Sequence, residues 1–180
     1  MQSKNIEDLK YPIGKFQMAI SLEQSEINEW ITIIEQFPKS LNKIIPYLSS
    51  EELLYRYRPE GWTIKQVIHH CADSHMNSFM RFKLALTEDV PTIKPYEQGA
   101  WAQLPDARDY EIAPSMLLLK GLHARWGILL RALTPEDLNK TYIHPEKNKP
   151  LNLADTIGLY AWHCKHHLAH IRQALERQEP

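Results

Sequence analysis

The sequence predicts an all-α protein whose four long helices form a bundle. Apolar residues recur at spacings of 3 and 4 over four long segments, the period of an amphipathic helix. Almost no stretch shows the strict alternation of a β-strand. The 180 residues, 43% of them hydrophobic, are enough to bury one core without disulfides. We therefore expect residues 1–180 to form a single domain, a helical bundle.

The first helix is expected from about Ser21 to Leu48. Ser21 and Gln24 have the spacing of a capping box, which satisfies backbone N–H groups at a helix start. Pro38 has no N–H to donate, so it predicts a kink or a break. The apolar residues that define this segment are Trp30, Ile34, Phe37, Leu41, Ile44 and Leu48.

The second helix is expected from Thr63 to about Thr87, with Thr63 and Gln66 as its capping box. A long Pro-containing connection, from Glu88 to about Ala113, then leads to the third helix. Connections of this length inside a compact domain are uncommon and often functional. The apolar stripe of the second helix is Ile64, Ile68, Cys71, His75, Phe79, Phe82 and Leu86.

The third helix is expected from Pro114 to about Leu133, because proline is favoured in the first turn. Residues 134–137 predict a short helical turn, and residues 140–151 look extended. The fourth helix is expected from Asn152 or Leu153 to about Gln178. Its apolar side is Ile157, Cys164, Leu168, Ile171 and Leu175.

Charge and hydropathy exclude several classes of protein. The 21 Lys and Arg residues nearly balance the 22 Asp and Glu residues, which argues against a nucleic-acid partner. No apolar run approaches the roughly 20 residues that span a bilayer, and no secretory signal follows Met1. Cys71 and Cys164 lie within apolar helical patterns, which indicates inert core thiols. We expect a cytoplasmic protein.

Histidines cluster on two of the helices. Three of the nine lie between residues 69 and 75, and four lie between residues 163 and 170. His163 and His167 are four residues apart, so both rings project from one side of the fourth helix and can bind one metal ion. Three histidines from two helices suit a catalytic metal site with an open position. The alternative is a set of partly buried structural histidines.

The second helix supplies a polar stripe away from its apolar side. His70, Ser74, Asn77 and Arg81 follow one another at spacings of 4, 3 and 4, as in the wall of a pocket. Periodicity alone does not choose between His69 and His70 as a ligand.

The remaining histidines have simpler interpretations. His75 lies on the apolar stripe and is expected to be a core histidine. His166 and His170 are expected behind the ligands or at the surface. His144, beside Pro145, is expected in a turn, with the mouth of the pocket as an alternative.

Several motifs resemble the YfiT branch of the DinB/YfiT superfamily. They keep their order and spacing over nearly the whole chain. They are residues 11–14, 61–70, 72–78 and 81–84, the His144–Pro145 pair, and residues 158–171.

The resemblance implies a four-helix bundle, commonly a homodimer, in which three histidines hold one divalent metal ion. One ligand of the family lies eight residues after the tryptophan of the second helix, which here leads from Trp62 to His70. The other two match His163 and His167. Imidazole ligands suit zinc, nickel, copper or iron. We expect zinc, with nickel as the alternative.

The resemblance also implies metal-dependent hydrolysis of a small-molecule substrate by a metal-bound water. Arg81 or Asn77 would then stabilise developing negative charge. No carboxylate falls on the histidine stripes, which disfavours peptidase activity.

Two alternatives use the same site. In the first, the metal activates the thiolate of a low-molecular-weight thiol such as bacillithiol for transfer to an electrophile, with Arg81 and Lys83 holding the anionic thiol. In the second, the protein is a non-enzymatic, metal-stabilised binding protein.

Overall fold

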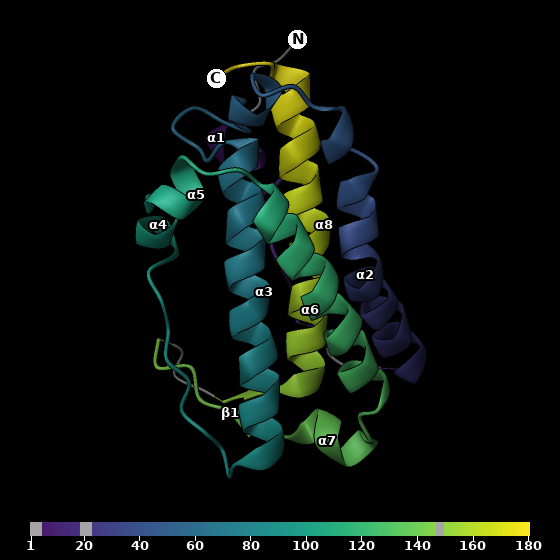
Figure 1. Ribbon diagram of the computed structural model, residues 1–180. Coiled ribbons are helices and arrows are strands. Elements are labelled where there is room, and N and C mark those ends of the chain that lie inside the picture. Colours follow the sequence, from purple (N-terminus) through teal and green to yellow (C-terminus); the bar gives the residue numbers. More distant parts are fainter. Residues whose placement is uncertain (1–4, 19–22, 147–149) are drawn as a thin grey trace.

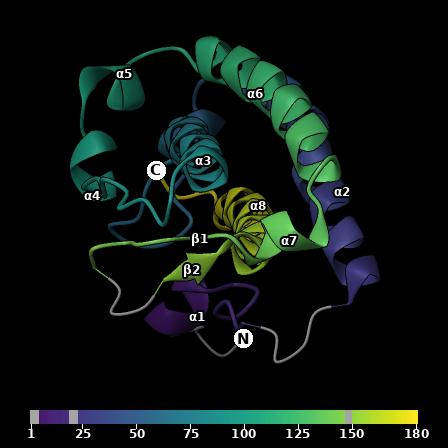
Figure 2. The same ribbon diagram turned by 90° about the horizontal axis from the view of Figure 1, so that it is seen from below.

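Four long helices form the bundle in the computed structural model, which describes residues 5–18, 23–146 and 150–180 (Figure 1). They are α2 (Gln24–Asn42), α3 (Ile64–Thr87), α6 (Ala113–Arg131) and α8 (Leu153–Arg177). Helices α2 and α3 each pack against both α6 and α8, as the view along the bundle shows (Figure 2). The all-α four-helix bundle predicted from the sequence is confirmed.

Short elements connect and cover these helices. Among the described residues, the connection between α3 and α6 contains two single-turn helices and runs back along α3 (Figure 1). The two strands form an antiparallel ribbon before α8, in the segment expected to be extended. The short elements are α1 (Ile6–Lys10), η1 (Ile45–Tyr47), η2 (Glu52–Leu54), α4 (Gln98–Trp101), α5 (Pro105–Arg108), α7 (Pro135–Asn139), β1 (Thr141–Tyr142) and β2 (Leu151–Asn152).

Helix α2 differs from its prediction at both ends. It begins at Gln24 after a capping box formed by Glu23 and Glu26, whereas the predicted cap, Ser21, lies outside the described residues. It ends at Asn42, and Ile45–Tyr47 forms a separate 3₁₀ turn. The apolar spacing continues across this boundary because Ile44 and Leu48, beyond the helix end, still pack against the core.

A kink or a break was predicted at Pro38; this residue lies inside α2, so the helix is not broken there. Proline removes the donor for the carbonyl four residues earlier, here that of Ile34. The Nδ1 atom of His123, on α6, lies 2.6 Å from this carbonyl oxygen. A side chain from a neighbouring helix thus replaces the missing backbone donor.

The start of α3 is fixed as predicted. Thr63 accepts from the N–H of Gln66, and the Gln66 side chain accepts from the N–H of Thr63. The Gln66 amide also donates to the carbonyl of Ala102 at 2.8 Å, which ties the long connection to α3.

The core fills the space between the long helices. Fully buried side chains come from all four, among them Ile34, Phe82, Trp126 and Ile157. Within the described ranges, every helix is too short or too polar to cross a bilayer.

Candidate metal centre

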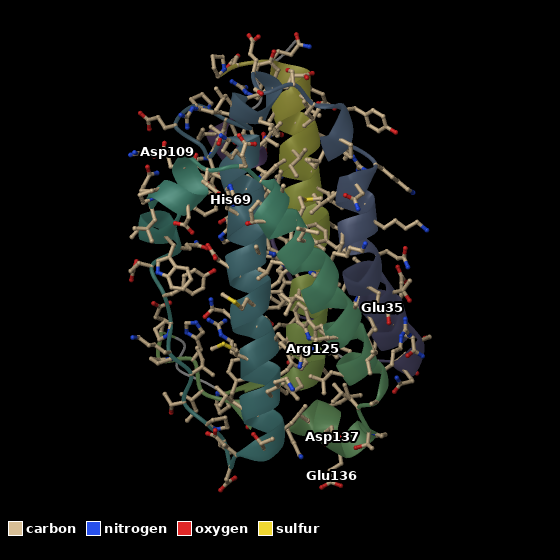
Figure 3. The ribbon with its side chains drawn as sticks, in the orientation of Figure 1. Glu35, His69, Asp109, Arg125, Glu136 and Asp137 are labelled. Carbon is tan, nitrogen blue, oxygen red and sulfur yellow. The ribbon has the colours of Figure 1, made fainter. Side chains whose placement is uncertain are left out.

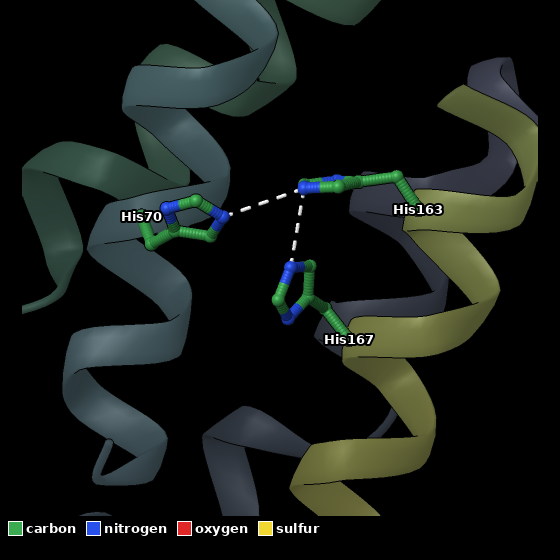
Figure 4. A group of neighbouring side chains, drawn as sticks. All are labelled: His70, His163 and His167. Carbon is green, nitrogen blue, oxygen red and sulfur yellow. Dashed lines mark hydrogen bonds between the residues drawn. The ribbon is translucent and has the colours of Figure 1, made fainter. Parts of the chain in front are cut away.

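Three histidine side chains converge between α3 and α8 (Figure 4). The Nε2 atom of His163 lies 3.3 Å from Nε2 of His70 and 3.1 Å from Nε2 of His167. One ligand nitrogen from each ring lies within 4.8 Å of the other two. The structure therefore brings together the three residues predicted as metal ligands.

The spacing and chemistry of these nitrogens fit a divalent transition metal. Two nitrogens bound to a tetrahedral zinc ion at 2.0–2.1 Å lie roughly 3.3–3.4 Å apart, close to the two contacts of His163. Three imidazoles are a donor set that suits zinc and nickel.

His69 takes no part in this group. Its Nδ1 atom lies 2.8 Å from the Ser115 hydroxyl in the first turn of α6, on another side of α3 (Figure 3). Periodicity left His69 and His70 as alternatives, and the structure places His70 beside the histidines of α8.

Burial keeps the three rings neutral, the state in which they can bind a metal. It is the main reason that the pKa of His70 falls to about 4, and the neighbouring His166 adds to the effect. The pKa values of His163 and His167 are lowered well below the ordinary value for the same reasons. All three are neutral at pH 7, and a metal binds the neutral ring.

Two further histidines of α8 are buried beside the centre. His166 stacks on Trp162, and His170 stacks on Tyr57 with its Nε2 atom 3.1 Å from the carbonyl oxygen of Lys10. His166, His167 and His170 form a second group whose geometry could hold an ion. His167 belongs to both groups, and the group that includes His70 is the one predicted from the sequence, so it is the better candidate.

Behind His163, two more rings continue into the core. His75 Nε2 lies 3.0 Å from His163 Nδ1, and His75 Nδ1 lies 2.8 Å from His123 Nε2. His75 is buried, as its place on the apolar stripe predicted. The sequence reasoning missed its contact with His163, and it missed His123 altogether, because both contacts join different helices.

The centre lies between two cavities that share His163 and Gln98. The first has a volume of about 390 Å³ and is lined by all three candidate ligands. Its remaining lining residues are Lys10, Tyr11, Tyr57, Arg58, Trp62, Trp162, His166 and His170.

The second cavity has a volume of about 320 Å³. Arg81 lines it, together with His144, for which the mouth of the pocket was an alternative. Asn77 does not: its amide donates to the carbonyl of Asp73 at 2.9 Å, and its side chain lines an adjacent cavity. The structure thus brings Arg81, but not Asn77, into a cavity with His163.

The cavities also contain charged residues that the sequence reasoning missed. Lys10 and Arg58 line the first, and Glu97 and Glu146 line the second. Glu97 belongs to the long connection, whose length was the signal of a functional segment. Lys10 and Arg58 lie on short segments without a periodic pattern, so only the fold places them here.

A four-helix bundle with three neutral histidines facing a cavity defines a class of helical metal-site protein. The chain belongs to the DinB superfamily, whose family model matches residues 33–171. The predicted family membership is confirmed.

Relatives match nearly the full length of the chain. A protein of Bacillus mycoides named "Putative metal-dependent hydrolase" is 48% identical over 172 residues, which are 96% of this chain and 98% of that protein. One of the same name from Oceanobacillus iheyensis is 48% identical over 170 residues, which are 94% of this chain and 98% of that protein.

A solved structure extends the likeness to the fold. YfiT from Bacillus subtilis, described as "a probable metal-dependent hydrolase with an unusual four-helix bundle topology", superposes with a TM-score of 0.91 at 40% identity. The match covers 94% of this chain and 97% of that one, so the YfiT-like bundle is confirmed.

Proposed function

We propose that this protein is a metal-dependent hydrolase of small molecules. The observation that supports this best is the convergence of three neutral Nε2 atoms, from His70, His163 and His167, beside a cavity of about 390 Å³. When bound, a divalent metal supplies a Lewis acid and lowers the pKa of a coordinated water to near 7. We propose zinc, with nickel as the alternative.

The protein's own residues supply substrate binding and charge stabilisation. Lys10 lines the first cavity, but its ammonium is paired with Glu7 at 3.1 Å. Arg58 gives this cavity a cationic group, and Tyr57 and Trp62 give it aromatic surfaces. A substrate with an anionic group and an apolar part would satisfy both. Arg81 lines the second cavity together with His163, and it would stabilise negative charge that develops during the reaction.

Glu97 offers the carboxylate that is missing from the histidine stripes of α3 and α8. It lines the second cavity with His163, so it can accept or return a proton there. Asn77 has a weaker case as a charge-stabilising residue, because its amide already donates to a backbone carbonyl.

Thiol transfer is the second candidate. Arg58 and Arg81 line the cavities on the two sides of His163, and they would bind an anionic low-molecular-weight thiol equally well. Lys83, the other residue expected to hold the thiol, lies with its ammonium 5.0 Å from the centroid of the Phe79 ring and lines neither cavity. We also propose that the protein is a homodimer, that it is located in the cytoplasm, and that it binds neither nucleic acid nor membranes. Light scattering on the purified protein tests the dimer.

The first test is the metal content of untagged protein, measured by mass spectrometry for wild type, His70→Ala and His163→Ala. We expect about one zinc or nickel ion per chain in wild type and loss in both variants. His69→Ala is the matched control, because the neighbouring ring contacts Ser115 and should leave the metal in place. Folded wild type that neither contains nor takes up zinc or nickel would contradict the proposal.

The same preparation separates the candidate reactions. Metal-dependent turnover of anionic aryl esters without any thiol would support hydrolysis. Metal-dependent conjugation of bacillithiol to chlorodinitrobenzene, with no ester turnover, would support transfer instead. Metal binding with neither activity would favour a binding protein.

A further inference from the structure

A row of three histidine rings runs from the candidate metal centre through the core to a backbone carbonyl. His163 Nδ1 lies 3.0 Å from His75 Nε2, and His75 Nδ1 lies 2.8 Å from His123 Nε2. His123 Nδ1 lies 2.6 Å from the carbonyl oxygen of Ile34. The four groups come from α8, α3, α6 and α2, so each long helix contributes one.

The Ile34 carbonyl fixes the direction of the hydrogen bond that it makes with His123. A carbonyl oxygen can only accept, so the proton of this contact is on Nδ1 of His123. Pro38, four residues after Ile34, has no N–H to occupy the carbonyl. Pro38, where a kink or a break was expected, thus leaves the Ile34 carbonyl free to accept from a side chain of α6.

Each ring of the core pair is neutral at pH 7. The exposed fractions of His75 and His123 are 0% and 1%, and their ring neighbours include Phe37 and Trp126. A charged imidazolium in such surroundings is costly because it is removed from water. Burial lowers the pKa of His123 to about 4.

One proton per ring then determines every hydrogen bond in the row. His123 carries its proton on Nδ1, so its Nε2 atom is an acceptor and His75 donates from Nδ1. The Nε2 atom of His75 is then an acceptor, and His163 donates from Nδ1. This leaves a free lone pair on Nε2 of His163, the atom that faces His70 and His167.

We propose that His75 and His123 are positioning residues that hold His163 in the tautomer and ring orientation required for a metal ligand. Metal-binding histidines usually donate their second N–H to a carboxylate, a backbone carbonyl or water. Here the carbonyl is reached through two intervening rings, which couple the ligand to the packing of all four helices. This inference rests on the metal site of the proposed function.

His167 has a shorter row of its own. Its Nδ1 atom lies 3.4 Å from Nδ1 of His170, whose Nε2 atom lies 3.1 Å from the Lys10 carbonyl. Because the contact between the rings is long, the proposal is confined to His163.

The direct test is the tautomer of each histidine in metal-free wild type, read from long-range ¹H–¹⁵N spectra at pH 7. We expect protonated Nδ1 and bare Nε2 atoms for His123, His75 and His163. A proton on Nε2 of His163 would overturn the proposal. This measurement needs no variant and no activity, so its outcome is independent of whether the protein is a hydrolase.

The second test measures zinc affinity by competition with a chromophoric chelator. His75→Phe keeps the ring volume but removes both nitrogens, and we expect zinc binding about 10- to 100-fold weaker. His75→Gln can still accept from His163 and donate to His123, so it should recover most of the affinity. Phe82→Leu is the control for lost packing, because it changes a fully buried ring on the same helix outside the row.

The outcomes of the second test are distinct. Folded His75→Phe that binds zinc as tightly as wild type would overturn the proposal, as would an equal loss of affinity in Phe82→Leu. If His75→Phe does not fold, His123→Leu takes its place, with the tautomer of His163 as the readout. If wild type has the expected tautomers but binds no zinc, the hydrogen-bond row stands and the proposed function fails.

Discussion

At the scale of single residues, burial determines which side chains are chemically available. Cys71 and Cys164 each follow a candidate ligand, His70 or His163, directly in the sequence, yet both thiols point into the core and are fully buried. Burial raises the pKa of each thiol well above its ordinary value. The thiolate is the reactive form, so these cysteines are inert in the folded protein.

We therefore expect no rapid reaction of the native protein with Ellman's reagent at pH 8. In guanidinium chloride, two thiols per chain should react at once, matching the two cysteines of the sequence. The measurement is absorbance of the released chromophore against time. Rapid native reaction of either thiol would show that the core around the centre opens.

At the scale of helices, two glycines have opposite roles. A Cβ atom on Gly158 of α8 would lie 2.9 Å from the ring of Trp30 on α2, so glycine permits this close approach. A Cβ atom on Gly121, on the exposed side of α6, would meet nothing within 4 Å. Glycine at that position only lowers the stability of the helix.

Alanine substitutions at these positions should change stability in opposite directions. Gly121→Ala should raise the free energy of unfolding by about 0.5–1 kcal/mol. Gly158→Ala should lower it by about 1–3 kcal/mol, because the new methyl group displaces Trp30. Urea unfolding followed by circular dichroism measures both. A gain in stability at Gly158 would show that the ring moves aside easily.

At the scale of the whole molecule, buried neutral histidines make stability depend on pH. Burial lowers the pKa of His123 and His166 to about 4, whereas in the unfolded chain a histidine titrates near 6.5. Between these values the unfolded chain binds more protons than the folded one. The free energy of unfolding therefore rises with pH across this range and falls on acidification.

Metal-free protein should accordingly lose stability as the pH falls from 6.5 towards 4, by up to about 1.4 kcal/mol per pH unit for each such ring. Thermal unfolding at a series of pH values measures this. His123→Leu should show a shallower slope than wild type, because it removes one of the rings. An unchanged slope in this variant would show that His123 takes up its proton over the same pH range in the folded and the unfolded chain.

The same scales separate what could be predicted from what could not. The four helices, the capping box of Thr63 and Gln66, and the common side of His163 and His167 all follow from interactions within a few residues. Helix period and capping are local, so the sequence by itself determined them. The place of His70 needed the family pattern, since periodicity left His69 as an equal alternative.

Only the tertiary structure decided the contacts between helices. It ended α2 at Asn42 although the apolar spacing continues, and it kept the helix intact through Pro38 because His123 supplies a donor from α6. It placed Lys10 and Arg58 beside the histidines and separated Asn77 from them. These features depend on groups far apart in the chain, and the spacing of residues along one helix contains no information about what the neighbouring helix places opposite them.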